Sequence, residues 1–326
     1  MPAKSQLVLV TGGAGYIGSV LVRRLLDSGY RVRVLDRLMY GGEPVVDLLN
    51  HDLFDFIKGD VRDRATCDRA VAGVDAVAHL AAIVGDPACA KYPEEATSTN
   101  LDGSKLLYEA AASAGVGRFV FASTCSNYGR MSDPNAFVHE DSPLSPVSLY
   151  AKTKVAFEQY LLASKTKCAP VCLRFSTVYG LSPRLRFDLT VNEFTKEAAL
   201  GRELVIFGEQ FWRPYCHVVD LARSVIACIE ASLEKIDHKV FNVGDTSENY
   251  QKQMLVDEIR KFIPELSVKY VSKGEDPRDY RVSFDKIRNE LNFVISKKVP
   301  EGIQQTITAI RSGFISNPDA AQYKNI

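Results

Sequence analysis

The sequence predicts an α/β protein: a doubly wound parallel sheet followed by a smaller, mixed C-terminal lobe. Through the first 180 residues, short apolar runs rich in β-branched residues alternate with helical patterns. These runs are apolar on both faces, which is typical of a parallel sheet covered by helices on both sides. After about residue 180 the alternation loosens and the connections become more polar.

In chain order, the expected strands of the sheet are residues 6–12, 31–36, 54–60, 75–82, 118–124 and 170–180. The helices expected between them are residues 17–29, 62–73, 99–115 and 149–165. In the mixed lobe we expect helices at 191–201, 217–231, 254–263 and 301–314, and strands at 203–208 and 239–245. Residues 317–326 are expected to form a frayed tail.

Charge and cysteine content exclude several classes of function. Forty Lys and Arg residues balance forty Asp and Glu residues, so charge gives no reason to expect a nucleic-acid or membrane surface. No stretch approaches the roughly 18 apolar residues of a membrane-spanning helix, and we expect no signal peptide. The seven scattered cysteines favour reduced thiols in a cytoplasmic protein, and we expect no metal site.

The segment TGGAGYIG, residues 11–18, has the glycine spacing of a dinucleotide-binding loop. It follows a strand and opens a helix. Gly12 permits the tight turn, Gly15 lets the backbone approach a diphosphate, and Gly18 lets helix and strand pack closely. The helix N-terminus supplies the positive end of a dipole.

The ends of the next strands complete this site. Asp36 ends the second strand, where a carboxylate accepts hydrogen bonds from the ribose hydroxyls and repels a 2′-phosphate, so NAD is favoured over NADP. Arg37 beside it could reach such a phosphate. Asp60 and Val61 end the third strand, where the adenine is expected.

The segment HLAA, residues 79–82, ends the fourth strand beside the expected nicotinamide. Core packing is the alternative role for Val61 and Ala81. His79 lies in an apolar strand and is more readily explained as a structural histidine than as a ligand or base.

Tyr150 and Lys154 lie four residues apart, on one face of a helix that Ser148 can begin. A phenol titrates near pH ~10, so a tyrosine needs a neighbouring cation to act as a base at neutral pH. Lys154 can supply that charge, and its remaining donors can hold the nicotinamide ribose.

Together these motifs resemble the extended short-chain dehydrogenase/reductase family, specifically its NAD-dependent sugar-nucleotide epimerases and dehydratases. The matching segments are residues 11–18, Asp36, 59–61, 79–82, Asn100, 123–129, Tyr150 with Lys154, 174–180, 213–220 and 241–245. The resemblance implies a Rossmann sheet and bound NAD that takes a hydride from a sugar carbon, usually C4. The cofactor-binding residues it implies are Gly12, Gly15, Tyr16, Ile17, Gly18, Asp36, Arg37, Asp60, Val61, Leu80, Ala81, Ala82, Tyr150 and Lys154.

The resemblance also divides the chain. Residues 1–180 are expected to form the NAD-binding domain that carries the catalytic residues. Residues 181–326 are expected to form mostly a substrate-binding lobe, with segments near 205–245 returning to the Rossmann sheet. The helical segments 106–115 and 154–162 could form the four-helix seam of a homodimer, as in relatives.

Thr124, Cys125 and Ser126 lie at the end of the fifth expected strand. In the family, a hydroxyl at the place of Thr124 shares the sugar oxygen with the catalytic tyrosine, so the implied catalytic residues are Thr124, Tyr150 and Lys154. Relatives that are 4,6-dehydratases carry an Asp-Glu pair at the next two positions, and neither Cys125 nor Ser126 replaces a carboxylate well. Relatives that are 3,5-epimerases use a cysteine in the slot of Ser126, which leaves Cys125 as a minority candidate for a base.

By the same resemblance, Arg213 and Arg278 would bind the substrate phosphates, Asn192 would lie near the nucleotide, and Cys125 and Ser126 would line the sugar site. Arg184 and Arg186 are further candidate cations, with surface salt bridges as the alternative role.

We therefore expect an NAD-dependent enzyme that oxidises C4 of a nucleotide-linked hexose or heptose. It would be a 4-epimerase if the ketone is reduced again, and a 4-dehydrogenase or 4-ketoreductase if the product leaves. The alternatives are a 4,6-dehydratase or a cysteine-assisted 3,5-epimerase and, from another class, a non-catalytic NAD-sensing regulator. A place in polysaccharide biosynthesis follows from the resemblance.

Overall fold

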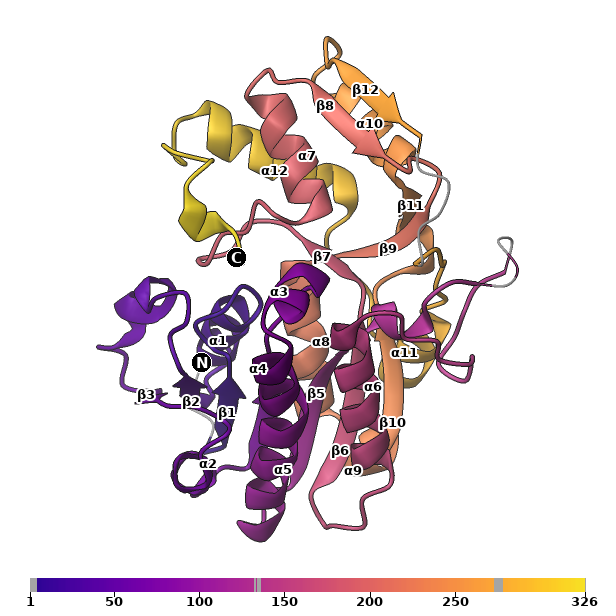
Figure 1. The fold of residues 1–326 in the computed structure, drawn as a ribbon. Helices are drawn as coiled ribbons and strands as arrows, with labels where there is room; N and C mark the ends of the chain where they lie inside the picture. Colours follow the sequence, from indigo (N-terminus) through magenta and orange to yellow (C-terminus); the bar gives the residue numbers. More distant parts are fainter. Residues whose placement is uncertain (1–4, 132, 134–135, 273–277, 326) are drawn as a thin grey trace.

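A computed structural model describes residues 5–131, 133, 136–272 and 278–325 of the chain. Its largest element is a seven-stranded sheet with the order β10-β6-β5-β4-β1-β2-β3, in which every neighbouring pair is parallel (Figure 1). The strands are β1 (Leu7–Thr11), β2 (Arg31–Asp36), β3 (Phe54–Lys58), β4 (Ala76–His79), β5 (Arg118–Thr124), β6 (Ala169–Phe175) and β10 (Lys239–Val243).

Helices cover both faces of this sheet. Helices α1 (Gly18–Asp27) and α8 (Val218–Glu230) pack together on one face, and α2 (Arg64–Val71), α5 (Ser104–Ser113) and α6 (Leu149–Leu162) lie on the other. Because side chains alternate along a strand, Val8 and Val10 of β1 join one core while Leu7 and Leu9 join the other. The prediction of a doubly wound parallel sheet is confirmed.

Short elements connect the strands of the large sheet. They are the 3-10 turns η1 (Glu43–Leu48) and η3 (Cys125–Tyr128), helices α3 (Asp86–Lys91), α4 (Pro93–Thr97) and α9 (Leu233–Ile236), and the π-helical turn η2 (Ser98–Gly103). Helix α11 (Asp285–Leu291) comes after β12 in the chain and packs against β10. Because of η2, the helix expected at 99–115 begins with a wider turn. That turn holds Asn100, whose side-chain amide bonds both backbone groups of Ile83 at 2.8 and 2.9 Å.

A second lobe lies beyond the carboxyl ends of the strands (Figure 1). It contains a three-stranded sheet, ordered β11-β9-β7, and a parallel pair, β12-β8. The strands are β7 (Thr177–Tyr179), β8 (Leu204–Phe207), β9 (Trp212–His217), β11 (Asn249–Gln251) and β12 (Val268–Val271). Helices α7 (Thr190–Ala199), α10 (Lys252–Arg260) and α12 (Val299–Arg311) share its hydrophobic core, and the turn η4 (Thr246–Glu248) precedes β11.

The chain passes between the lobes more than once. Within the region near 205–245, α8 and β10 belong to the large sheet and its helices, whereas β8 and β9 lie in the second lobe. No helix in the described ranges is both long and apolar enough to span a membrane.

The expectation of a frayed tail is wrong for the described part of that segment. Residues Ala321–Tyr323 form the 3-10 turn η5, and the Tyr323 ring packs edge-on against Phe187 with the ring centroids 5.6 Å apart. The tail therefore has a fixed place on the second lobe, close to the gap between the lobes (Figure 1).

Candidate active site

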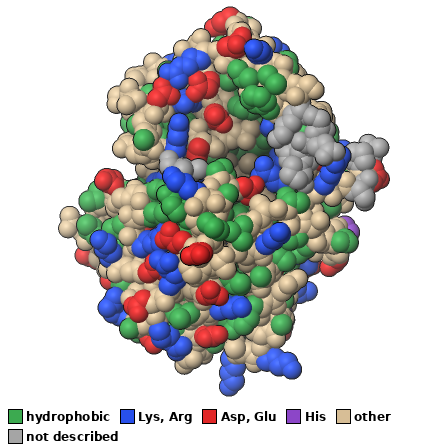
Figure 2. All heavy atoms as spheres, viewed as in Figure 1, with side chains coloured by type: hydrophobic (Ala, Val, Ile, Leu, Met, Phe, Trp, Pro, Cys, Tyr) green, Lys and Arg blue, Asp and Glu red, His purple; other side chains and the backbone are tan. Residues whose placement is uncertain are grey.

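A cavity of about 680 Å³ lies at the carboxyl ends of the parallel strands and is closed from the other side by the second lobe. The surface is visibly hollowed between the lobes (Figure 2). The strand order reverses between β1 and β4, and the cavity opens where the chain leaves these two strands. Such reversal points are where open α/β sheets bind ligands.

Two glycines let the backbone line this cavity closely. Gly12 has φ of +73°, and a Cβ there would lie 2.8 Å from the backbone nitrogen of Ala81. A Cβ on Gly18, the first residue of α1, would collide with the carbonyl oxygen of Gly12. Both positions therefore require glycine, and the start of α1 presents its backbone and its positive dipole end to the cavity.

Asp36 stands at the end of β2 and faces the same cavity. One carboxylate oxygen accepts a hydrogen bond from the Ala14 nitrogen at 3.0 Å, and the other accepts from the Leu38 nitrogen at 2.8 Å. Burial raises the pKa of Asp36, and the two backbone donors oppose that rise. The carboxylate is thus fixed between the glycine loop and the β2 end, where it can accept bonds from ribose hydroxyls.

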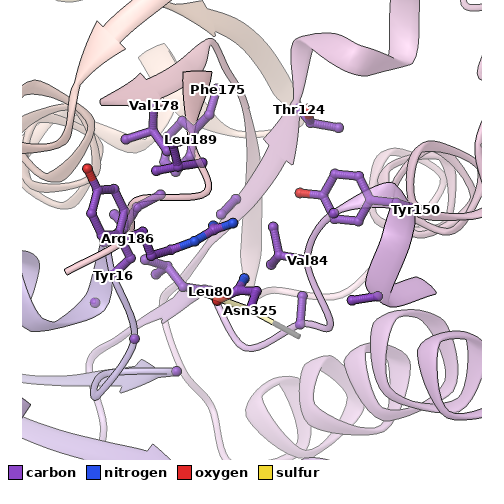
Figure 3. Close-up of a pocket in the computed structure, with 18 of the residues that line it drawn as sticks. Tyr16, Leu80, Val84, Thr124, Tyr150, Phe175, Val178, Arg186, Leu189 and Asn325 are labelled. Carbon is purple, nitrogen blue, oxygen red and sulfur yellow. The ribbon is translucent and has the colours of Figure 1, made fainter. Parts of the chain in front are cut away.

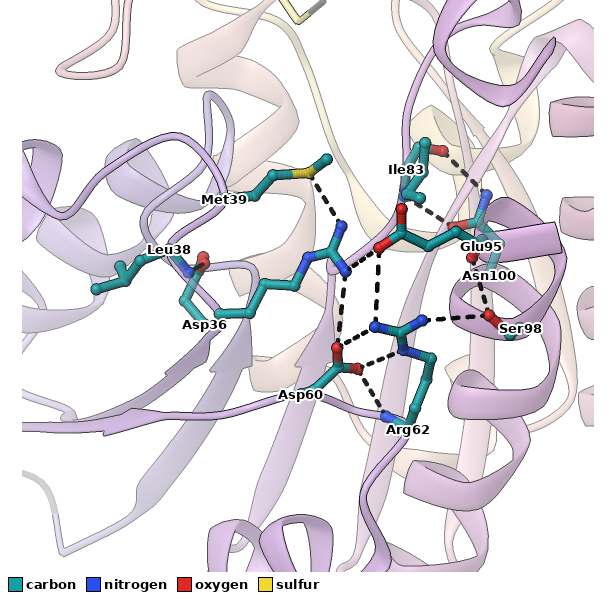
Figure 4. Close-up of polar contacts among 10 residues, drawn as sticks. Asp36, Leu38, Met39, Asp60, Arg62, Ile83, Glu95, Ser98 and Asn100 are labelled. Atoms are coloured by element: carbon teal, nitrogen blue, oxygen red, sulfur yellow. Dashed lines mark hydrogen bonds and ion pairs between the residues drawn. The ribbon is translucent and has the colours of Figure 1, made fainter. Parts of the chain in front are cut away.

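Arg37 takes part in a network of charges, whose other members Asp60, Arg62 and Glu95 are labelled in Figure 4. Its guanidinium lies 2.6 Å from a carboxylate oxygen of Glu95 in α4 and 3.6 Å from one of Asp60. Arg62 joins the same two acids, at 2.6 Å to Asp60 and 3.8 Å to Glu95. The two positive and two negative charges of this network balance. Because Arg37 is paired with Glu95, its guanidinium is not available to bind a 2′-phosphate, the role that its position beside Asp36 suggested.

All the residues predicted to bind the cofactor line this one cavity: Gly12, Gly15, Tyr16, Ile17, Gly18, Asp36, Arg37, Asp60, Val61, Leu80, Ala81, Ala82, Tyr150 and Lys154. The arrangement fits a dinucleotide. It offers a glycine loop without side-chain obstruction, a fixed carboxylate for a ribose and a helix N-terminus for a diphosphate.

Tyr150 and Lys154 lie in the first turns of α6, which Ser148 caps by accepting a hydrogen bond from the Ala151 nitrogen at 3.2 Å. The Tyr150 hydroxyl points into the cavity, with Thr124 close by (Figure 3). The ammonium nitrogen of Lys154 donates to the carbonyl oxygen of Ala122 at 2.9 Å and lies 5.8 Å from the centroid of the Tyr150 ring.

Burial shifts the pKa values of both groups toward their neutral forms. It raises the pKa of Tyr150, as do the neighbouring Cys89 and Asp86, and it lowers the pKa of Lys154 to about 7. The raised pKa of Tyr150 means that losing the phenol proton is costly, and a charged Lys154 ammonium beside the ring lowers that cost. This pair is therefore suited to acid–base chemistry on a hydroxyl group in the cavity.

A buried ion pair fixes α6 against the sheet beneath this site. Glu158 accepts from Arg174 of β6 at 2.5 Å and from the hydroxyl of Ser123 in β5 at 2.7 Å. Arg174 also donates to the hydroxyl of Tyr128 at 2.9 Å. His79 is equally structural: it bonds Thr11 and Ser104 at 2.7 and 2.8 Å, and burial lowers its pKa to about 3.

Thr124, the last residue of β5, and the two residues that follow it point in different directions. Thr124 and Ser126 line the cavity, whereas Cys125 lies in the core and donates to the carbonyl oxygen of Arg174 at 3.2 Å. Burial raises the pKa of the Cys125 thiol. The structure therefore removes Cys125 from the predicted set of substrate contacts and from the candidate bases, because a buried, protonated thiol is a poor base.

Of the residues predicted to bind the substrate, the two arginines line the cavity and Asn192 does not. Arg213 and Arg278 line the cavity, and Arg278 pairs with Asp86 at 2.8 Å. Asn192 lies behind the cavity wall, where it accepts from the Gly180 nitrogen at 2.8 Å and donates to the Tyr16 hydroxyl at 3.1 Å. Its position corrects the expectation of a direct nucleotide contact, since both ends of its amide are engaged inside the protein.

Several cavity residues were not among the predicted site residues. Those that matter below are Tyr40, Arg184, Arg186, Asp188, Tyr280 and Asn325. The two arginines were visible in the sequence as cations before a helix, although surface salt bridges explained them equally well. Nothing in the sequence indicated that Tyr40 or Asn325 belongs to the site, because a lone tyrosine in a loop and an asparagine in a polar tail are common.

Comparison with known proteins agrees with this geometry. A family model described as the NAD dependent epimerase/dehydratase family matches residues 8–244. A dTDP-glucose 4,6-dehydratase from Streptomyces niveus is 31% identical, over 96% of this chain and 97% of its own length.

Two solved structures resemble the whole chain. A UDP-glucose 4-epimerase from Thermotoga maritima, solved with UDP-glucose, has a TM-score of 0.82 at 28% identity, with 95% of this chain and 100% of that chain covered. A UDP-glucuronic acid 4-epimerase from Bacillus cereus, solved with UDP-glucuronic acid and NAD, has a TM-score of 0.83 at 26% identity, with 94% and 99% covered.

Proposed function

The chain belongs to the NAD-dependent epimerase/dehydratase family, and from that premise we propose that it is a 4-epimerase of a nucleotide-diphosphate sugar. The supporting observation is that Tyr150, Lys154 and Thr124 meet on one cavity wall beside the predicted nicotinamide site. When bound, NAD would accept a hydride from C4 and return it. Hexoses and heptoses linked to a nucleotide diphosphate are the substrate class.

Each residue has a chemical role in this proposal. Tyr150 takes the proton of the C4 hydroxyl, and the Lys154 ammonium stabilises the phenolate. The oxygen of Thr124 already accepts a hydrogen bond from the Ser126 nitrogen at 3.1 Å, so its own proton can be donated to the sugar oxygen. Arg213 and Arg278, which line the cavity, would neutralise the substrate diphosphate.

A 4,6-dehydratase is less well supported. Elimination of water needs an acid and a base near C5 and C6, and the two positions after Thr124 hold a buried thiol and a serine. Among the described residues lining the cavity, Asp86 pairs with Arg278 and Asp188 pairs with Arg186. Neither carboxylate is positioned by the structure as a free acid–base group for that step.

The test is a panel of UDP-, dTDP-, GDP- and CDP-sugars incubated with the purified protein and NAD. We expect at least one sugar to be inverted at C4 with no net absorbance change at 340 nm. Accumulating NADH would instead identify a dehydrogenase, and a 4-keto-6-deoxy product would identify a dehydratase.

Tyr150→Phe separates the enzyme from the NAD-sensing regulator. It should lower turnover by roughly 100-fold or more while NAD still binds, because general acid–base catalysis contributes that much. Tyr270→Phe is the matched control: Tyr270 lies on β12 of the second lobe, is exposed and does not line the cavity. A wild-type protein that binds NAD and turns over no sugar of the panel would support the regulator.

We also propose that the protein is a cytoplasmic homodimer of a polysaccharide pathway. On the outer side of α5 and α6, Leu106, Ala112 and Tyr160 are only partly buried, which suits a seam between two copies. Light scattering of the purified protein measures its mass directly, and a monomer at micromolar concentration would contradict the dimer.

A further inference from the structure

The guanidinium of Arg184 is a buried charged group in the cavity to which the proposed function assigns no role. Its side chain lines the cavity, yet the residue is only 5% exposed. Its Nε is buried with no hydrogen-bond acceptor among the described residues, and the carboxylate of Asp188, whose charge acts on Arg184, is paired with Arg186. A buried cation without an ion pair of its own is costly, so we take an anion that it binds as the best explanation for such a residue.

Arg184 is held in place from two directions. Its guanidinium carbon lies 4.3 Å from the centroid of the Tyr40 ring, in the loop after β2. Its Nη2 donates to the carbonyl oxygen of Lys324 in the C-terminal tail at 3.0 Å. The stack and the hydrogen bond fix the direction of the guanidinium, which lowers the entropy lost when it binds a ligand.

The tail that holds Arg184 bridges both lobes. The Asn325 nitrogen donates to Asp188 at 3.2 Å on the second lobe, and its carbonyl oxygen accepts from the Tyr40 hydroxyl at 3.1 Å on the first. The Asn325 side chain lies in the cavity near Arg186 (Figure 3), and its buried Oδ1 also has no partner among the described residues. Residues 321–325 thus form a strap along one side of the cavity.

The position of Arg184 points to one ligand. Tyr40 follows the β2 end, where Asp36 marks the adenosine ribose, and Ser182 donates to the carbonyl oxygen of Tyr16 in the glycine loop at 2.6 Å. Arg184 therefore lies over the middle of the predicted dinucleotide. The predicted substrate arginines, Arg213 and Arg278, instead lie near Tyr280 and Asp86.

We propose that Arg184, fixed by Tyr40 and by the tail strap, binds the diphosphate of the dinucleotide from the side opposite the glycine loop. The strap then covers the bound cofactor and slows its release. This inference rests on the proposed function, since it assigns Arg184 to the cofactor of the same site, and a cofactor that stays bound suits a reaction that returns its hydride.

The test compares ligand binding in NAD-free protein, measured by titration with NAD and separately with UDP. Arg184→Met should weaken NAD binding by roughly 10- to 100-fold, the range for a lost charged hydrogen bond, and should leave UDP binding unchanged. Arg260→Met, on the outer surface of the second lobe, removes the same charge and should change neither NAD binding nor UDP binding. A chain ending at Ala320 should release NAD at least tenfold faster than the full chain.

The outcomes separate this inference from the proposed function. If the wild-type protein does not bind NAD, the proposed function fails. If it binds NAD and Arg184→Met binds equally well, or loses UDP instead, the assignment of Arg184 is overturned. If Arg184→Met does not fold, the chain ending at Ala320 decides: unchanged NAD release would overturn the strap.

Discussion

At the scale of single residues, burying Lys154 lowers the stability of the fold but brings its ammonium close to Tyr150. Burial lowers its pKa from 10.5 to about 7, so between these values the unfolded chain binds more protons than the folded one. Wild-type stability should therefore rise with pH across this window. NAD-free Lys154→Met should be more stable than wild type by about 3 kcal/mol at pH 6.5, after allowance for the lost bond to Ala122.

Thermal melting at pH 6.5 and pH 9.5 measures this effect. The advantage of Lys154→Met should shrink at the higher pH, and the variant should be inactive at both. A variant that melts below wild type at pH 6.5 would contradict the view that the buried ammonium is strained.

We expect Glu95 to contribute to the preference for NAD over NADP. Its contact with Arg37 keeps that guanidinium from a 2′-phosphate. Glu95→Gln should raise the affinity for NADP relative to NAD by about fivefold, the effect of one nearby charge close to the surface. Glu94→Gln, its exposed neighbour on α4, removes the same charge without this contact. Equal ratios in the two variants would show that the Arg37 contact is not what sets the preference.

At the scale of elements, the catalytic helix depends on one buried carboxylate. Glu158 joins α6 to β5 and β6 through Ser123 and Arg174, and it is 1% exposed. Glu158→Ala should destabilise the protein by roughly 3–5 kcal/mol, because it leaves Arg174 buried without its partner. Glu109→Ala, at the exposed bond to Tyr160, should cost less than about 1 kcal/mol.

Chemical denaturation of the two variants provides the comparison. Similar losses in both would mean that the buried pair contributes no more than an exposed contact. Turnover should fall with Glu158→Ala even where the protein is still folded, since Tyr150 and Lys154 move with α6.

The elements that could be predicted are those whose pattern is local. The glycine loop, Asp36 at the end of β2, and Tyr150 with Lys154 on one helix each depend on a few neighbouring residues, and all of them line the cavity. The sequence did not show which way the Cys125 side chain points, because β5 ends at Thr124 and the 3-10 turn that follows directs the thiol into the core. The direct role expected for Asn192 was wrong for a different reason: its amide is engaged by Gly180 and by Tyr16, and Tyr16 lies 176 positions away in the sequence.

At the scale of the whole molecule, the site exists only because two lobes meet. The sheet supplies the glycine loop and the catalytic helix, and the second lobe supplies Arg184, Arg186 and the strap. Sequence patterns identified the sheet in detail because its strands are apolar and regular. The strap was missed because its contacts join residues more than a hundred positions apart, such as Arg184 with Lys324 and Tyr40 with Asn325.

Transfer of deuterium from C4 of the sugar reports whether a hydride passes between the sugar and NAD. UDP-glucose, UDP-glucuronic acid and dTDP-glucose, each deuterated at C4, are incubated with the protein and NAD and analysed by mass spectrometry. With at least one sugar we expect the label to move to the nicotinamide ring and to return to an inverted C4, and we expect Tyr150→Phe nearly to abolish this transfer. Loss of the C4 label to water, or transfer in Tyr150→Phe as fast as in wild type, would contradict the proposed function.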